Sequence, residues 1–139
     1  MFEKLKNIIR KFVYSKITPP YIPASYSQAG EDAVLRFLFN DKGIRKISYL
    51  EIGTNIPDID NNTYLFYKEG SRGVCVEADK TLIPAIKKIR PEDKVLNIGV
   101  SVSEHDEADF YIFDIRGINT FDKDEAEKRE KFGTIKLLK

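Results

Sequence analysis

The chain has 139 residues, of which 42% are hydrophobic and 12% aromatic, so it suits one domain with a buried core and is too apolar to be wholly disordered. Its formal net charge of +1 provides no overall basic surface for nucleic acid, and no RNA- or DNA-binding motif is present. The single cysteine, Cys75, excludes an internal disulfide, is expected to be a buried hydrophobe, and is typical of a reducing, cytoplasmic setting.

The first 20 residues are basic and amphipathic, with five Lys or Arg side chains against one Glu, a balance of +4. Apolar side chains at helical spacing predict a basic helix over about residues 1–17: Phe2, Leu5, Ile8, Ile9, Phe12 and Val13. This helix is too short to span a bilayer and lacks the features of a signal peptide. Two roles are open: peripheral contact with the anionic inner face of the membrane, or packing on its own domain or a second subunit, which we favour. A proline-rich connector follows up to residue 24.

From residue 25 onward, predicted helices and strands alternate. Apolar spacing, with acids in the first turn, predicts a helix over about residues 31–39, and the apolar run 47–52 predicts the first strand. A second helix, capped by Asn61 or Asn62, ends at Gly70. Then follow a strand at 73–77, a helix at 82–89 that Asp79 can cap, a strand at 94–102, a polar turn at 103–107, a strand at 108–113 and a charged, solvated helix at 122–131. This order predicts an α/β fold with a parallel sheet, right-handed crossovers and an antiparallel hairpin at the sheet edge.

Polar side chains stand at the ends of the first two strands, where a doubly wound sheet binds its ligand. Glu51, Gly53 and Asn55 end the first strand, and Glu77 ends the second. The first turn has one glycine instead of three, so a phosphate cradle is poorly supported. S-adenosylmethionine has no phosphate and carries a sulfonium cation, and two carboxylates with an asparagine suit it better.

The two acids also have structural interpretations. Glu77 lies 24 residues beyond Gly53, close to the spacing at which an acid binds ribose hydroxyls in such folds. It could equally be a helix cap or a solvated strand end. Glu51 could be a structural acid bonded to loop amides, and Gly53 a simple turn glycine.

Four segments together resemble the amino-terminal half of FkbM-type methyltransferases, over about residues 25–120. These segments are an S-Q-x-G-E-D motif at 27–32, an E-x-G-x-N-x-P turn at 51–57, the pair Asn62-Thr63, and a G-x-x-G-x-x-x-E strand at 70–77. The combination is much more specific than any one piece.

This resemblance implies a Rossmann-like class I methyltransferase fold, S-adenosyl-L-methionine as cofactor, and methyl transfer to an oxygen of a sugar or other small-molecule acceptor. It implies no catalytic base that we can name. Gln28 and Glu31 would close over the pocket, although a helix-capping role is at least as well supported. By the same resemblance, Glu51, Gly53 and Asn55 would contact the methionine part of the cofactor, Glu77 its ribose, and Asp79 and Ser101 the region of the adenosine.

The sequence departs from the family after residue 121. The later strand with an acidic-x-E-G motif is absent, so we expect residues 25–139 to form a truncated cofactor-binding domain whose first strand has an open edge. Such an edge could pair with another chain or a second copy. The alternative to an enzyme is therefore a non-catalytic half domain that associates through this edge. A nicotinamide-dependent oxidoreductase is a weaker alternative, because the glycine-rich turn is missing.

Two further features are read as structural. His105, the only histidine, is expected in a solvated turn rather than as a general base. Asp58 and Asp60, with the two asparagines that follow, could attract a divalent cation but are interpreted as a polar loop with a helix cap. No cysteine and histidine set has zinc spacing, and we expect no metal.

Overall fold

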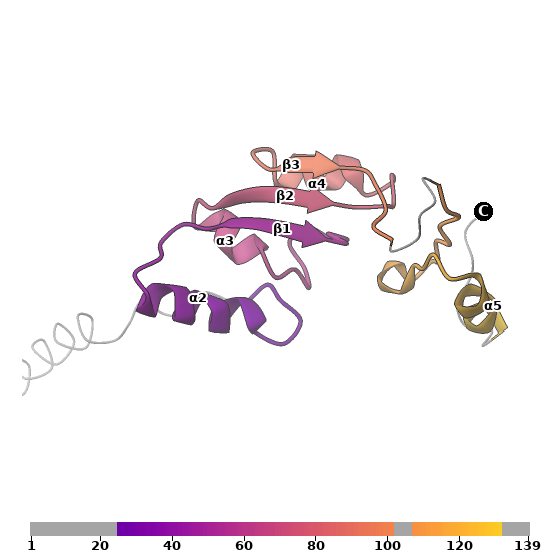
Figure 1. The fold of residues 1–139 in the computed structure, drawn as a ribbon, viewed down its shortest axis with the longest axis horizontal. Helices are drawn as coiled ribbons and strands as arrows, with labels where there is room; N and C mark the ends of the chain where they lie inside the picture. The colour runs from indigo at the N-terminus through magenta and orange to yellow at the C-terminus, as the bar shows by residue number, and fades with distance from the viewer. Residues whose placement is uncertain (1–24, 102–106, 132–139) are drawn as a thin grey trace, which may run out of the picture.

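The computed structural model describes residues 25–101 and 107–131 (Figure 1). The basic helix predicted over 1–17, its connector and His105 lie outside the described residues. The elements are α2 (Glu31–Asp41), β1 (Ser48–Ile52), α3 (Tyr64–Lys68), β2 (Arg72–Val76), α4 (Ile83–Ile89), β3 (Lys94–Leu96), the 3-10 turn η1 (Arg116–Ile118) and α5 (Lys123–Lys131).

The three strands form one parallel sheet in the order β1-β2-β3, which confirms the predicted α/β class. The register pairs Leu50 with Val74 and Glu51 with Cys75. Because successive side chains of a strand point to opposite faces, Leu50 and Glu51 lie on opposite sides of the sheet. Figure 1 shows α3 and α4 behind the strands, on one face. A parallel sheet of three strands with helices between them is compatible with part of a Rossmann-like fold.

The core lies between the sheet and α4. Cys75, Leu82 and Ile86 are buried there, with Ile83 and Val95 packed against them. Leu82, Ile83 and Ile86, at the start of α4 and within it, are at helical spacing and pack against Cys75 of β2 and Val95 of β3. As predicted, Cys75 behaves as a small buried hydrophobe.

Helix α2 is anchored by its own first turn and by α3. Asp32 is fully buried and accepts hydrogen bonds from the hydroxyls of Ser25 (2.6 Å) and Ser27 (2.9 Å) and from the Tyr26 N–H (2.8 Å). The ring of Phe39 meets that of Phe66 edge to face, with 5.7 Å between centroids. These hydrogen bonds tie residues 25–27 to the first turn of α2, whose N-cap residue is Gly30.

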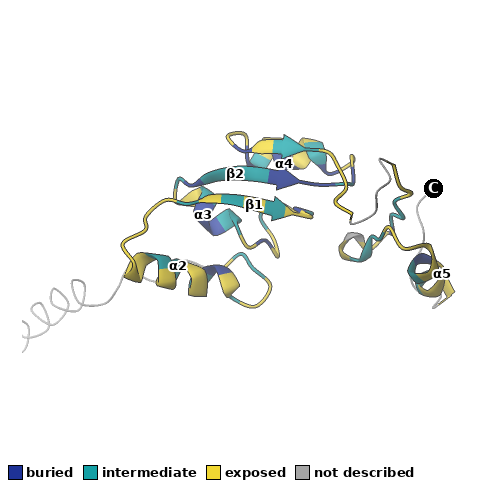
Figure 2. Cartoon of the chain, in the orientation of Figure 1, coloured by how far each residue is buried: buried dark blue, intermediate teal, exposed yellow. Residues whose placement is uncertain are grey.

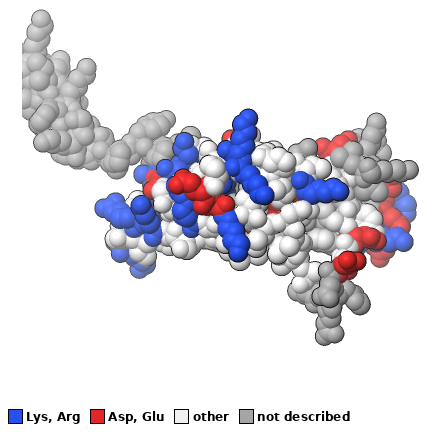
Figure 3. Space-filling model, turned by 90° about the horizontal axis from the view of Figure 1, so that it is seen from above, with Lys and Arg blue, Asp and Glu red and all other residues white. Residues whose placement is uncertain are grey.

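The opposite face of the sheet is open over β1 in the described part of the chain. Leu50 and Ile52 are 61% and 59% exposed, and Figure 2 shows β1 with exposed and half-buried residues in alternation. Within these residues, β1 pairs with β2 alone. In the face shown in Figure 3, basic side chains with a group of acidic ones among them occupy one half of the molecule, and further acidic side chains lie toward the end that carries α5. No helix in the described ranges is long and apolar enough to cross a membrane.

Two sequence predictions about the later strands were wrong. The third strand stops at Leu96 rather than continuing toward 102, because the Asn97 side chain donates to the carbonyls of Glu77 (2.8 Å) and Ala78 (3.0 Å). The predicted strand and edge hairpin at 108–113 is replaced by one antiparallel bridge between Tyr111 and Thr120. Residues 111–120 therefore pair with each other through this bridge and do not add a strand to the sheet. By contrast, the charged helix predicted at 122–131 is present as α5.

Candidate ligand-binding site

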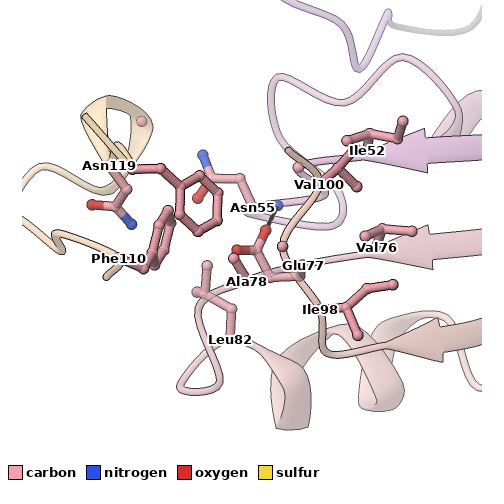
Figure 4. A pocket seen from close by; sticks show the side chains of 14 residues that line it. Ile52, Asn55, Val76, Glu77, Ala78, Leu82, Ile98, Val100, Phe110 and Asn119 are labelled. Atoms are coloured by element: carbon pink, nitrogen blue, oxygen red, sulfur yellow. Dashed lines mark hydrogen bonds between the residues drawn. The ribbon is translucent and has the colours of Figure 1, made fainter. Parts of the chain in front are cut away.

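A cavity of about 290 Å³ lies at the carboxyl edge of the sheet (Figure 4). The ends of β1 and β2 and the residues after β3 form one wall, and residues between 110 and 121 form the other. Most of the wall is apolar, and the polar side chains in it are Asn55, Glu77 and Asn119. An apolar hollow with a few convergent polar groups, placed where parallel strands end, is the usual form of a small-molecule site.

Glu77 is the central polar group of this site. It is 5% exposed, and its carboxylate accepts the N–H of Asn55 through Oε2 (2.7 Å) and the N–H of Asp79 through Oε1 (2.8 Å). One side chain therefore ties the loop after β1 to the loop after β2. Because each carboxylate oxygen has two lone pairs, both oxygens retain acceptor capacity toward a ligand.

Asn55 is held in an unusual backbone conformation. Its φ of 51° lies in the left-handed region, which Asn tolerates better than most residues. Gly53, two residues earlier, also has a positive φ of 74°. Figure 4 shows the Asn55 side chain at the pocket, beside Glu77. Its Oδ1 is buried without a hydrogen-bond partner in the described structure.

Three of the predicted cofactor-binding residues line the pocket, and three do not. Gly53, Asn55 and Glu77 are in the wall, whereas Glu51, Asp79 and Ser101 are outside it. Glu51 occupies the β1 position paired with Cys75, which faces the helices. The expectation that Glu51 and Glu77 share one hollow is therefore not met in this arrangement.

Glu51 and Asp79 nevertheless each leave a buried oxygen unpaired. Among the described side chains, Glu51 Oε2, Asn55 Oδ1 and Asp79 Oδ2 are buried and have no hydrogen-bond partner. The other oxygen of Asp79 accepts from the N–H (2.9 Å) and hydroxyl (2.7 Å) of Thr81, so Asp79 caps the turn before α4. Unpaired buried acceptors are costly, and of these three only Asn55 Oδ1 belongs to a residue of the pocket wall, where a ligand could donate to it.

Gln28 and Glu31 do not line the pocket. Both are exposed, and Glu31 accepts the N–H of Ala29 at 2.9 Å. That bond and its own backbone N–H lower the pKa of Glu31. The N-cap position of α2 is Gly30 and has no side-chain cap hydrogen bond, so helix capping by Gln28 or Glu31 is not observed.

The sequence did not single out the second wall of the pocket. Phe110 and Phe121 pack with 4.6 Å between ring centroids, and the Asn119 Oδ1 accepts the N–H of Phe113 at 2.9 Å. A Cβ on Gly99 would collide with the Phe121 ring, so this glycine allows the wall to approach the sheet. Aromatic residues in a short, irregular segment have no periodic pattern, and only three-dimensional contact brings them to the site.

The described wall offers little acid–base chemistry. Glu77 is the only ionisable side chain of this wall, and each of the two Glu77 carboxylate oxygens already accepts a hydrogen bond from a backbone N–H. Cys75 is buried beneath the sheet, and this burial raises the pKa of its thiol to about 11, so it is not a nucleophile at neutral pH. Within the described ranges, no group of three or more His, Cys, Asp or Glu residues could hold a metal ion. The arrangement suits binding and orientation.

Comparison of the chain with protein-family models, with curated proteins and with solved structures gave no match.

Proposed function

We propose that the protein binds S-adenosyl-L-methionine at this pocket and transfers its methyl group to a hydroxyl of a sugar or other small metabolite. The observation that carries the proposal is the Glu77 carboxylate, which joins the loops after β1 and β2 at the mouth of an apolar hollow. The motif resemblance over residues 25–120 supports the choice of cofactor.

The polar chemistry of the site favours a cationic ligand rich in hydrogen-bond donors. The pocket wall offers the Asn55 Oδ1, a buried acceptor without a partner among the described residues, and the Glu77 carboxylate. The cofactor would bring a sulfonium, an ammonium group and two ribose hydroxyls. A pyrophosphate would instead place negative charge beside these oxygens, which is unfavourable. This also disfavours a nicotinamide dinucleotide.

When bound, the cofactor would supply an electrophilic methyl group for transfer to the acceptor oxygen, with S-adenosylhomocysteine as the leaving group and water as the acceptor of the hydroxyl proton. The protein residues bind and orient. Glu77 and Asn55 would hold the polar part of the ligand, and the apolar wall formed by Leu82, Ile98 and the two phenylalanines would exclude water. Catalysis would then depend mainly on proximity and alignment.

Titration calorimetry with S-adenosylmethionine and S-adenosylhomocysteine tests the proposal, and we expect heat of binding with both. The informative variant is Asn55→Gly, because glycine accepts a φ of 51° and removes only the side chain. We expect it to weaken binding roughly tenfold, equivalent to about 1.4 kcal/mol.

Asp60→Gly is the matched control for that variant. Asp60 also has a positive φ, 52°, but is exposed and outside the pocket, so its substitution relaxes the backbone in the same way without touching the site. Its affinity should equal that of the wild type. Folded protein that gives no heat with either ligand contradicts the proposal.

A second candidate is a non-catalytic half domain that associates with another chain. The exposed Leu50 and Ile52 on a strand with one described pairing partner favour it. A protein that stays monomeric in solution and transfers methyl groups would contradict this alternative.

A further inference from the structure

The loop that presents Asn55 to the pocket is bound to β2 through the N–H groups of Gly53 and Thr54, which donate to the Val76 carbonyl, and is held further at the Thr54–Asn55 peptide group. The carbonyl of Thr54 accepts the Asn61 Nδ2 at 3.3 Å, and the N–H of Asn55, on the other side of the same peptide bond, donates to Glu77 Oε2 at 2.7 Å. Two side chains from different segments therefore fix the plane of the Thr54–Asn55 peptide. The left-handed φ of Asn55 depends on that orientation.

Asn61 is itself oriented by neighbours on its oxygen side. Its Oδ1 accepts the N–H of Tyr64 (2.9 Å), the N–H of Thr63 (3.2 Å) and the Arg90 Nη1 (3.0 Å). With its oxygen surrounded by donors, the amide can present only its nitrogen to the Thr54 carbonyl. Asn61 is 1% exposed, so water does not compete for these groups.

Arg90 is a fully buried cation that the proposed chemistry does not use. Besides Asn61, its guanidinium donates to the Thr63 hydroxyl (2.7 Å) and forms an ion pair with Asp93 through Nε (2.8 Å). Asp93 in turn accepts the hydroxyl of Tyr49 and the N–H of Gly73, at the beginnings of β1 and β2. The guanidinium is thus held in place from the sheet, and its fork geometry reaches the loop after β1.

We propose that Arg90 and Asn61 are positioning residues for the ligand site. Arg90 fixes the Asn61 amide, Asn61 fixes the Thr54–Asn55 peptide, and that peptide aims the Asn55 side chain at the pocket. This inference rests on the proposed function for the identity of the ligand. Neither residue lines the pocket, so both act through Asn55.

Asn61→Asp tests this relay with the smallest change. An aspartate keeps an oxygen for Arg90 and for the two helix amides, but it puts a second oxygen opposite the Thr54 carbonyl where an N–H stood. We expect the Kd for S-adenosylhomocysteine to rise about tenfold. The amide resonance of Asn55 in a nitrogen–proton correlation spectrum should shift, because its peptide plane turns.

The matched control is Thr63→Val. This substitution removes the hydroxyl that accepts from Arg90 (2.7 Å) and donates weakly to Asn61 Oδ1 (3.4 Å), but it leaves the bond from Arg90 Nη1 to Asn61 and the bond from Asn61 to the Thr54 carbonyl. It should lower the thermal midpoint, as Asn61→Asp does, while affinity and the Asn55 resonance stay unchanged. Equal losses of affinity in both variants would overturn the inference, because general destabilisation would then explain them.

The two proposals fail in different ways. If the wild-type protein binds neither S-adenosylmethionine nor S-adenosylhomocysteine, the proposed function fails. The positioning role of Asn61 is then still tested by comparing the Asn55 amide resonance of Asn61→Asp with that of the wild type. An Asn55 resonance that is the same in Asn61→Asp and in the wild type overturns the relay even if ligand binding is present.

Discussion

At the scale of single residues, the site depends on side chains that form hydrogen bonds with the backbone of the protein itself, whether or not a ligand is bound. Glu77 was expected either to bind ribose or to be a helix cap or a solvated strand end; it is buried, and its carboxylate bridges two loop amides. The two interpretations are compatible, because a carboxylate has about four acceptor positions and the amides use two. A ligand contact at Glu77 would thus be added to a structural role. Substitutions there must be judged on stability and affinity together.

Glu77→Gln should reduce both quantities. Glutamine keeps one acceptor oxygen and turns the other into an N–H2 donor, so either the Asn55 or the Asp79 N–H loses its partner. An unsatisfied buried amide costs about 1–3 kcal/mol. We expect that loss in urea unfolding and, by calorimetry, at least a roughly tenfold weaker affinity for S-adenosylhomocysteine.

Glu92→Gln is the control for this charge removal. The Glu92 side chain is 60% exposed in its ion pair with Arg72, and exposed pairs contribute about 0–1 kcal/mol. Equal stability of Glu77→Gln and the wild type would show that the two loop amides find other acceptors, and that Glu77 does not hold the loops together.

At the scale of elements, close approach between β1 and β2 depends on a glycine. A Cβ on Gly73 would collide with both the ring and the carbonyl oxygen of Tyr49, its register partner on β1. The carbonyl belongs to the backbone and cannot turn away, so the strands would have to separate. The Tyr49 hydroxyl bond to Asp93 would be strained by the same movement.

Gly73→Ala should therefore destabilise the protein by about 1–3 kcal/mol, as overpacking in a core does. Gly117→Ala is the comparison, because a Cβ there meets no atom within 4 Å. That control should stay within about 0.5 kcal/mol of the wild type. Chemical unfolding of both variants measures the difference. A wild-type midpoint for Gly73→Ala would show that the ring and strand adjust freely.

Much of the element order followed from periodicity. Alternation and apolar runs marked β1, β2 and α4. Asn61, one of two predicted caps for α3, accepts the Tyr64 N–H, although the residue at the N-cap position is Thr63. The length of β3 was overestimated. An asparagine side chain can take the place of the backbone hydrogen bonds between strands, and the Asn97 side chain does so at the end of β3. Apolar residues near 110 indicated a strand, whereas they pack against Phe121 and line the pocket.

The buried polar cluster could not be predicted. Arg90 ends a helix with two lysines before it, a pattern typical of a solvated helix end, and yet it is fully buried. Its partners Asn61, Thr63 and Asp93 are separated from it or from one another in sequence, so only the fold brings them together. Residues that follow strands are favoured positions for a site, and Gly53, Asn55 and Glu77 were found in that way.

At the scale of the whole molecule, the two faces of the sheet are unequal. Helices α3 and α4 cover one face, and the other presents Leu50 and Ile52 to solvent on a strand with one described neighbour. Exposed apolar residues beside free backbone donors and acceptors favour association with further chain. Over Ser48–Ile52 the edge has no lysine, proline or bulge that would oppose pairing.

We expect the wild-type protein to self-associate as its concentration rises, and Leu50→Lys to suppress this. A lysine at this exposed position places charge in the centre of the open face and, since Leu50 is 61% exposed, should change the unfolding free energy by no more than about 0.5 kcal/mol. Val34→Lys is the matched control, because Val34 on α2 is also 61% exposed but lies away from the sheet. Sedimentation velocity over a concentration series should show association in the wild type and in Val34→Lys, and monomer in Leu50→Lys. Association that persists equally in both variants would mean that the sheet face does not drive it, and a wild type that remains monomeric throughout would mean that this face needs no partner.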